Sequence, residues 1–330
     1  MPTIQPQVLK MLRELPSGPA NFYLESLLDP DLVFNQLPAR AKAHLTQMSN
    51  PKSFREHIKA KPKPFVGVAE GDSWFDYLPA YFDLDLFNGD LLGELNDDDH
   101  FHVFKVAKAG DTLDNMVFGP NNTGEQLRKT LQAIEANDAR FFLFSGGGND
   151  VAGPELERFL FPAASAPDPS LPIRKDVVEA VLGKAFTATF NHLIDEVRRV
   201  SPKIAIFLHG YDFAVPDGRA VINIPFGFHF VGPWLKPAFV NKGITAVTVQ
   251  QRVIDFLIDR LNKTIAAVAK QRASHNVHHI DVRGTLTKSR PSYRKDWANE
   301  LHPTGRGWKK VANLFTAEIL AVLQSKQETG

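Results

Sequence analysis

Four widely separated blocks of the chain carry residues that together could transfer an acyl group to a hydroxyl. Gly71 ends a short apolar run and is followed within two positions by Ser73, so a buried strand could deliver this hydroxyl to the end of a sheet. Gly110 follows a second apolar run, Asn149 follows a third, and His302 lies just before the last helical pattern. Any one of these residues alone would mean little, so the combination carries the interpretation.

The residue types in these blocks match the needs of nucleophilic catalysis. A serine hydroxyl reacts well only when a base removes its proton, and the resulting oxyanion needs preorganised donors. His302 is the candidate base and would later return the proton to a leaving alcohol. The backbone N–H groups of Ser73 and Gly110 and the side-chain amide of Asn149 are the candidate oxyanion donors. We expect Asp72 to be structural and to brace the neighbouring turn.

In this chain order, the four blocks resemble the SGNH (GDSL-type) hydrolase superfamily, which is named for a serine, a glycine, an asparagine and a histidine. The resemblance covers roughly residues 65–315. It implies a flavodoxin-like sheet in the strand order 2-1-3-4-5, metal-independent ester hydrolysis and the four roles just given. The α/β-hydrolase alternative is disfavoured, because the chain contains no Gly-x-Ser-x-Gly elbow.

One position departs from the family pattern. Three residues before the histidine the family usually has an aspartate, and here Asn299 stands there. An asparagine carbonyl can accept from the imidazole and fix its tautomer, but it leaves the imidazolium less stabilised by about 1–2 kcal/mol. Asp296 is the next candidate for orienting His302, followed by Glu300 and a backbone carbonyl.

Apolar runs alternate with amphipathic helical patterns over most of the chain. Uninterrupted apolar runs suit parallel strands that are covered on both faces. The expected strands lie near 65–70, 101–107, 141–145, 203–209 and 277–282, and the longest helices near 174–200, 245–273 and 304–325. This alternation predicts an α/β fold, a three-layer α/β/α sandwich around a parallel five-stranded sheet. Ligands bind at the carboxyl ends of such strands, where the candidate residues gather.

The predicted organisation is one catalytic domain with an extension. Residues 1–60 contain short helical patterns and no convincing strand, and the proline-rich stretch 59–64 forms a boundary. Residues 61–330 form the expected hydrolase domain. Two loop-rich insertions within it, 151–172 and 211–243, leave from strand ends and should wall the pocket.

Aromatic residues suggest an apolar acyl or alcohol pocket. Trp74 follows the candidate nucleophile, while Phe213, Phe228 and Trp234 lie in the later insertion. We expect short- to medium-chain acyl esters as substrates. Carbohydrate O-deacetylation and lysophospholipid cleavage are the alternatives, and a non-catalytic binding module is a third, since Asn299 replaces the acid.

Composition excludes several other classes. The 330 residues include no cysteine, which rules out disulfides and thiolate metal sites, and we expect neither a metal nor another cofactor. A net charge of +1 gives no excess of positive charge that would indicate nucleic-acid binding. No run approaches the length of a membrane span, and no secretory signal is evident, so we expect a cytoplasmic protein acting on a small-molecule ester. Residues 1–60 are a possible homo-oligomer contact.

Overall fold

A computed structural model shows how the chain folds. It describes residues 48–77, 90–119, 123–219, 222–224, 228–230 and 232–325, with the side chains of 222–224 and 228–230 left out. Within these ranges, no helix combines the length and the apolar content that crossing a membrane requires.

Five parallel strands form the central sheet. They are β1 (Phe65–Glu70), β2 (Phe101–Lys105), β3 (Phe141–Ser145), β4 (Ala205–His209) and β7 (Val277–Ile280). Their spatial order is β2-β1-β3-β4-β7, and every neighbouring pair is parallel. Because β7 is the fifth strand of this sheet along the chain, the order is 2-1-3-4-5, and the predicted fold class is confirmed.

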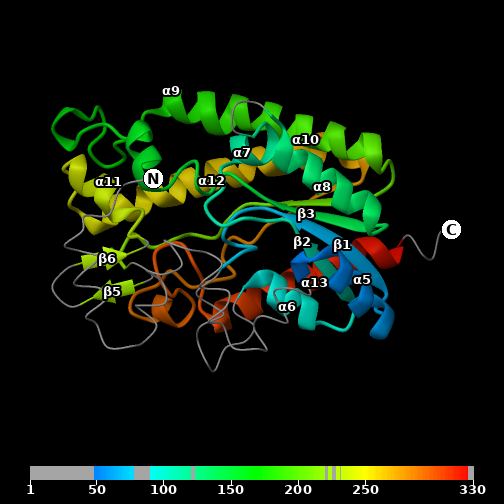
Figure 1. Ribbon diagram of the computed structural model, residues 1–330. Coiled ribbons are helices and arrows are strands. Elements are labelled where there is room, and N and C mark those ends of the chain that lie inside the picture. Colours follow the sequence, from blue (N-terminus) through cyan, green and yellow to red (C-terminus); the bar gives the residue numbers. More distant parts are fainter. Residues whose placement is uncertain are drawn as a thin grey trace, which may run out of the picture.

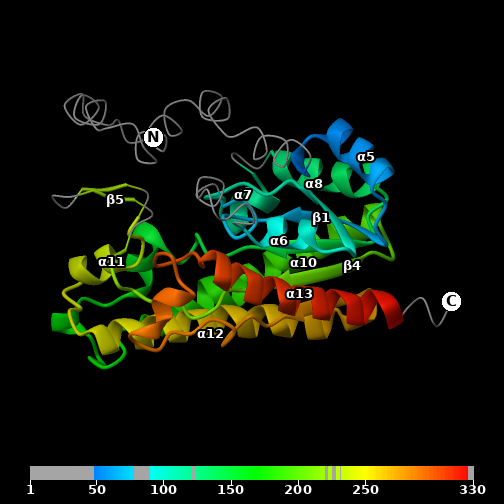
Figure 2. The same ribbon diagram turned by 90° about the horizontal axis from the view of Figure 1, so that it is seen from below.

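Helices cover both faces of the sheet. The helices are α5 (Pro51–Ala60), α6 (Leu91–Asp97), α7 (Leu113–Val117), α8 (Glu125–Ala136), α9 (Lys175–Val178), α10 (Phe186–Val200), α11 (Lys236–Asn241), α12 (Val247–Gln271) and α13 (Gly305–Ser325). Figure 1 shows α8, α10 and α12 on one face of the sheet, with α6 and α13 on the other. Seen after a quarter turn, α13 lies in front of the sheet along its length (Figure 2), and it packs against β4 and β7.

The strand sequences explain why the sheet lies in the core. Every residue of β2, β3 and β4 is buried. Strands covered by helices on both faces need apolar side chains in both directions, and the phenylalanine-rich segment 141–144 supplies them. The helices α10 and α13 bury one apolar face each against this sheet.

Several predicted bounds differ from the structure. The second strand ends at Lys105, because the next two backbone N–H groups, of Val106 and Ala107, both turn to the carbonyl of Ala69. The fifth strand ends at Ile280. The long helix predicted at 174–200 is interrupted by a π-helical segment, Glu179–Ala185, between α9 and α10.

The predicted extension and insertions are only partly within the described residues. Residues 1–47 lie outside them, so an oligomer contact there stays a prediction. Helix α5 packs on the sheet edge, where the buried ring of Phe54 meets His102 and Phe104 of β2. The insertion 151–172 forms 3₁₀ turns, and the insertion 211–243 carries α11 and the hairpin of β5 (Ile222–Ile224) and β6 (Phe228–Phe230).

Candidate active site

Ser73 lies in a tight turn directly beyond β1. The backbone N–H groups of Phe75 and Asp76 both donate to the carbonyl of Asp72, so the chain turns at once after the strand. Gly71 permits this turn to sit against β3, because a Cβ there would lie 2.7 Å from the Cβ of Ser145. The Ser73 side chain is half-buried at the sheet's carboxyl edge.

The structure brings Ser73 and His302 into contact. Nε2 of His302 lies 2.7 Å from Oγ of Ser73, and Nδ1 lies 3.0 Å from Oδ1 of Asn299. The backbone N–H groups of Leu301 and His302 also donate to Oδ1 of Asn299, at 3.0 and 2.9 Å, so this atom must be the carbonyl oxygen. An acceptor at Nδ1 requires the proton there, which leaves Nε2 as a lone pair facing the Ser73 hydroxyl.

His302 is enclosed by aromatic rings. The ring of Tyr77 is stacked on the imidazole, with centroids 4.2 Å apart and planes at 22°, and the ring of Trp234 meets it edge-on at 5.3 Å. His302 is 3% exposed. Burial lowers the pKa of its imidazole from the usual 6.5 to about 3, because the charged form loses hydration without gaining a charged partner. The base is therefore neutral over a wide pH range.

The other candidates for orienting His302 have different partners. Asp296 is buried and pairs with Lys310 at 2.6 Å, while its carboxylate also accepts from the backbone N–H of Thr287. Glu300 turns away from the imidazole toward the later insertion. Asn299 is thus the residue that contacts Nδ1 in the described part of the chain.

Glu300 fastens the insertion to the histidine loop. Its Oε2 accepts from the backbone N–H groups of Trp234 and Leu235, both at 2.7 Å. Its Oε1 accepts from those of Gly218 and Lys236, at 2.9 and 3.0 Å. Burial raises the pKa of this carboxyl, and the four donors oppose that shift. The arrangement holds Trp234 next to His302.

Two of the three candidate oxyanion donors, Gly110 and Asn149, lie on neighbouring loops. Gly110 has φ = +85°, a left-handed conformation that favours glycine, and it is exposed. Asn149 lines the cavity next to Ser73, and its Nδ2 donates to the backbone carbonyl of Asp111 at 2.8 Å. Asp150 accepts from the N–H of Leu113 at 2.9 Å and so joins the same two loops.

Asp72 has the bracing role expected of it. Its buried carboxylate accepts from the backbone N–H of Trp74 at 3.0 Å, from the hydroxyl of Ser145 at 3.2 Å and from the hydroxyl of Tyr211. Burial raises the pKa of Asp72 to about 6. These contacts tie the turn of Ser73 to β3 and to the segment after β4.

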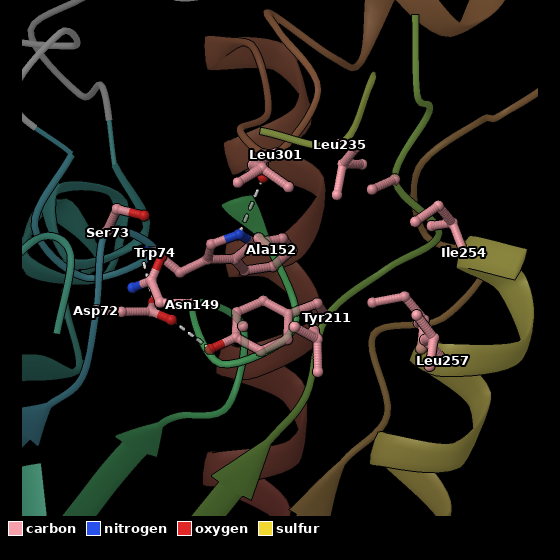
Figure 3. Close-up of a pocket in the computed structure, with 14 residues that line it drawn as sticks. Asp72, Ser73, Trp74, Asn149, Ala152, Tyr211, Leu235, Ile254, Leu257 and Leu301 are labelled. Carbon is pink, nitrogen blue, oxygen red and sulfur yellow. Dashed lines mark hydrogen bonds between the residues drawn. The ribbon is translucent and has the colours of Figure 1, made fainter. Parts of the chain in front are cut away.

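An apolar cavity of about 50 Å³ opens beside Ser73. Figure 3 shows Ser73 toward one end and residues of α12 toward the other, with the rings of Trp74 and Tyr211 between them. The apolar residues that line it are Trp74, Val151, Ala152, Tyr211, Ala214, Leu235, Ile254, Leu257, Ile258 and Leu301. Trp74 is fixed in place by its indole N–H, which donates to the carbonyl of Leu301 at 3.2 Å.

Of the other aromatic residues predicted to line the pocket, Trp234 lies at the site and Phe213 does not. Trp234 packs on His302, as described above. Phe213 does not line this cavity: its ring lies under Nζ of Lys288, at 4.0 Å from the centroid. The carboxylate of the preceding residue, Asp212, accepts from the N–H of Leu286 at 2.6 Å, which draws this segment toward residues 284–288. The side chain of Phe228 lies outside the described residues.

Histidine and carboxylate side chains form no cluster suited to a metal ion in the ranges that the structure describes.

Two features of the site were not predicted from the sequence. Tyr77 follows Ser73 by four positions, and an aromatic residue there gives no sign of whether it joins the core or contacts the base. Ile254, Leu257 and Ile258 recur at helical spacing, which is the same pattern that a purely structural helix shows. Their place in the cavity follows only from how α12 packs.

Comparison with protein families gives one match. The sequence pattern of the GDSL-like Lipase/Acylhydrolase family matches residues 66–310. Among the curated proteins, none matches the chain.

Solved structures that match the chain include a lipase, a carbohydrate esterase and a phospholipase. The extracellular lipase of Streptomyces rimosus is 15% identical, with 79% of this chain and 99% of that chain covered and a TM-score of 0.44. The family 3 carbohydrate esterase of Clostridium thermocellum is 14% identical, with 78% and 98% covered and a TM-score of 0.41. Phospholipase A1 of Streptomyces albidoflavus is 15% identical, with 80% and 99% covered and a TM-score of 0.42.

Proposed function

Since the chain belongs to the GDSL-like lipase/acylhydrolase family, we propose that it is a serine esterase that hydrolyses carboxylic esters through an acyl-enzyme. The observation that carries this proposal is the 2.7 Å contact between Oγ of Ser73 and Nε2 of His302, on an imidazole whose other nitrogen is fixed by Asn299. A nucleophile within hydrogen-bond reach of an oriented base is the arrangement that activates a serine.

The reaction has two halves. Oγ of Ser73 bonds to the ester carbonyl carbon while Nε2 of His302 takes the hydroxyl proton, and the negative charge moves to the carbonyl oxygen. The N–H groups of Ser73 and Gly110 and the amide of Asn149 are the donors for that oxygen. The bond to the leaving oxygen then breaks, and the alcohol departs with the proton from His302. Water repeats these steps on the acyl-enzyme and releases the carboxylic acid.

The cavity supports a short acyl group. A single water needs about 10–15 Å³ of such space, so 50 Å³ fits about four atoms of that size. This corresponds to an acyl group from about acetyl to butyryl. The mostly apolar lining favours a hydrocarbon chain over a polar one, because burying a polar group costs free energy unless a hydrogen bond compensates it. Carbohydrate O-deacetylation, which releases an acetyl group, fits this size as a second candidate.

The test combines covalent labelling with hydrolysis. Stoichiometric labelling by a fluorophosphonate, lost in Ser73→Ala, is the expected result. Hydrolysis of p-nitrophenyl acetate should fall to background in both Ser73→Ala and His302→Ala. Pure protein that neither labels nor hydrolyses above the Ser73→Ala background would refute the esterase and favour a binding module. The cytoplasmic location stays a prediction.

A further inference from the structure

The catalytic imidazole has no charged neighbour in the described part of the chain. Its two ring nitrogens contact a hydroxyl and an amide, and its surroundings are the rings of Tyr77 and Trp234. The nearest carboxylates in sequence, Glu300 and Asp296, are held by backbone N–H groups and by Lys310 respectively.

This arrangement raises an electrostatic problem for the proposed reaction. When His302 takes the proton from Ser73, an imidazolium forms on a ring that is only 3% exposed to solvent. A triad carboxylate would stabilise that charge, but Asn299 offers only the partial charge of an amide oxygen. Some other group must stabilise the cation if the serine is to be activated.

The Tyr77 ring has the geometry to do so. A cation within about 6 Å of an aromatic centroid and over its face is attracted by the negative potential of that face, and the attraction grows when water is absent. The imidazole of His302 lies 4.2 Å from the Tyr77 centroid and is tilted by only 22°, so it sits over the face and not at the edge. Both rings are buried, at 7% and 3% exposed.

Tyr77 also fixes the amide that orients the base. Nδ2 of Asn299 donates to the Tyr77 hydroxyl at 2.9 Å. If residue 299 were an aspartate, its second carboxylate oxygen would take the place of Nδ2 and would meet this same hydroxyl. The same side chain therefore contacts both His302 and its orienting residue.

We propose that Tyr77 is a catalytic residue whose ring face stabilises the imidazolium of His302 in the transition state, in place of the carboxylate that Asn299 lacks. This inference rests on the proposed esterase function. It predicts that Tyr77 and Asn299 are coupled: an aspartate at 299 makes the ring face dispensable.

The first experiment changes the ring face without changing its shape. Replacement of Tyr77 by 3-fluorotyrosine and 3,5-difluorotyrosine weakens the potential of the face. Burial raises the pKa of the Tyr77 hydroxyl, so these rings stay neutral at the assay pH. We expect kcat and the fluorophosphonate labelling rate to fall stepwise, by about twofold per fluorine, with KM unchanged. A flat series would overturn the proposal.

The second experiment is a double-mutant cycle. Tyr77→Phe removes only the hydroxyl, and Tyr77→Leu removes the face as well. We expect Tyr77→Leu to lower kcat about tenfold below Tyr77→Phe in the natural chain and by less than threefold in Asn299→Asp. Equal losses in both backgrounds would overturn the coupling.

A matched control removes an aromatic face from another histidine. Phe118 is stacked on His192, with centroids 5.2 Å apart and planes at 17°. Phe118→Leu should leave kcat within twofold, whereas a tenfold loss there would assign the Tyr77 effect to general destabilisation. If the natural protein shows no Ser73-dependent labelling or hydrolysis, the esterase function and the role of Tyr77 are both overturned. A reactive protein that is insensitive to Tyr77 overturns the role alone.

Discussion

Nδ1 of His302 lies 3.0 Å from Oδ1 of Asn299, so an amide and not a carboxylate orients the candidate base. Two backbone N–H groups hold that oxygen in place, and an imidazole with this partner keeps a defined tautomer without a stabilising charge. The pH dependence, the shape of the pocket and the linkage of its loops each give a prediction that can be measured.

Activity should persist well below neutral pH. Only neutral His302 can accept the serine proton, so activity is lost as pH falls through its pKa, which burial lowers to about 3. Asn299→Asp places a negative charge beside Nδ1, which raises that pKa and moves the acid limb of kcat/KM upward by about 1–2 pH units. A pH series from 3 to 8 checks this. If Asp296→Asn shifts the limb and Asn299→Asp does not, Asp296 orients the base.

Acyl-chain preference should depend on Leu257, which lines the cavity from α12. Leu257→Ala lengthens the cavity, so the optimum should move from acetyl–butyryl esters to longer chains. Leu257→Trp fills the cavity and should restrict the protein to acetyl esters. Kinetics on p-nitrophenyl esters of increasing length measure both effects.

The control for this series is Ile265→Ala, on the same helix, where the side chain is fully buried but does not line the cavity. Both alanine variants should lose about 2–5 kcal/mol of unfolding free energy. Only Leu257→Ala should change the preference, and an identical shift in both would contradict the assignment of the cavity as the acyl site.

Glu300→Gln should loosen the insertion. An amide nitrogen in place of one carboxylate oxygen would face two backbone N–H groups that now donate to Glu300, and each lost partner costs about 1–3 kcal/mol. We expect a lower unfolding free energy and a raised KM, because Leu235 lines the cavity and Trp234 packs on His302. Glu155→Gln, which breaks a surface pair with Arg158, should change stability by less than about 1 kcal/mol. Equal effects of the two variants would count against the linkage.

Asp76 should set the position of the Gly110 loop. Its carboxylate pairs with the buried Lys105 and accepts from the exposed N–H of Ala109 at 3.0 Å, one residue before Gly110. Asp76→Leu with Lys105→Met removes the link and leaves no buried charge unpaired, so stability should hold. Misplacing an oxyanion donor should lower kcat by about 10- to 100-fold.

Thermal unfolding and kcat are both measured for the Asp76→Leu/Lys105→Met variant, so that a loss of activity can be told from a loss of stability. A second pair of changes, Glu94→Leu with Lys309→Met, removes the contact of another buried carboxylate with a lysine, here an exposed one, between α6 and α13. It should leave kcat unchanged. If the Asp76 variant keeps full kcat, that contact has no part in positioning Gly110.

The sequence was sufficient for the sheet order and for the meeting of Ser73 with His302. The sheet order came from the resemblance to the SGNH family. The meeting of the two residues came from that resemblance together with the rule that ligands bind where parallel strands end at one edge. It also identified Asn299 as the first candidate for orienting the base. The aromatic contacts could not be predicted, because they depend on the direction of side chains in turns. Phe213 shows the limit: its aromatic type suggested the pocket, but the hydrogen bonds of Asp212 turned it toward Lys288.

The candidate nucleophile and base are separated by 229 positions in the chain. Helix α13 packs beneath the turn of Ser73, where the ring centroids of Trp308 and Trp74 lie 5.3 Å apart. Contacts this distant in sequence form late, because a large loop must first close. Catalytic competence should therefore report on completion of folding. During refolding, turnover should return only with the slowest phase, and a partly folded intermediate should be inert.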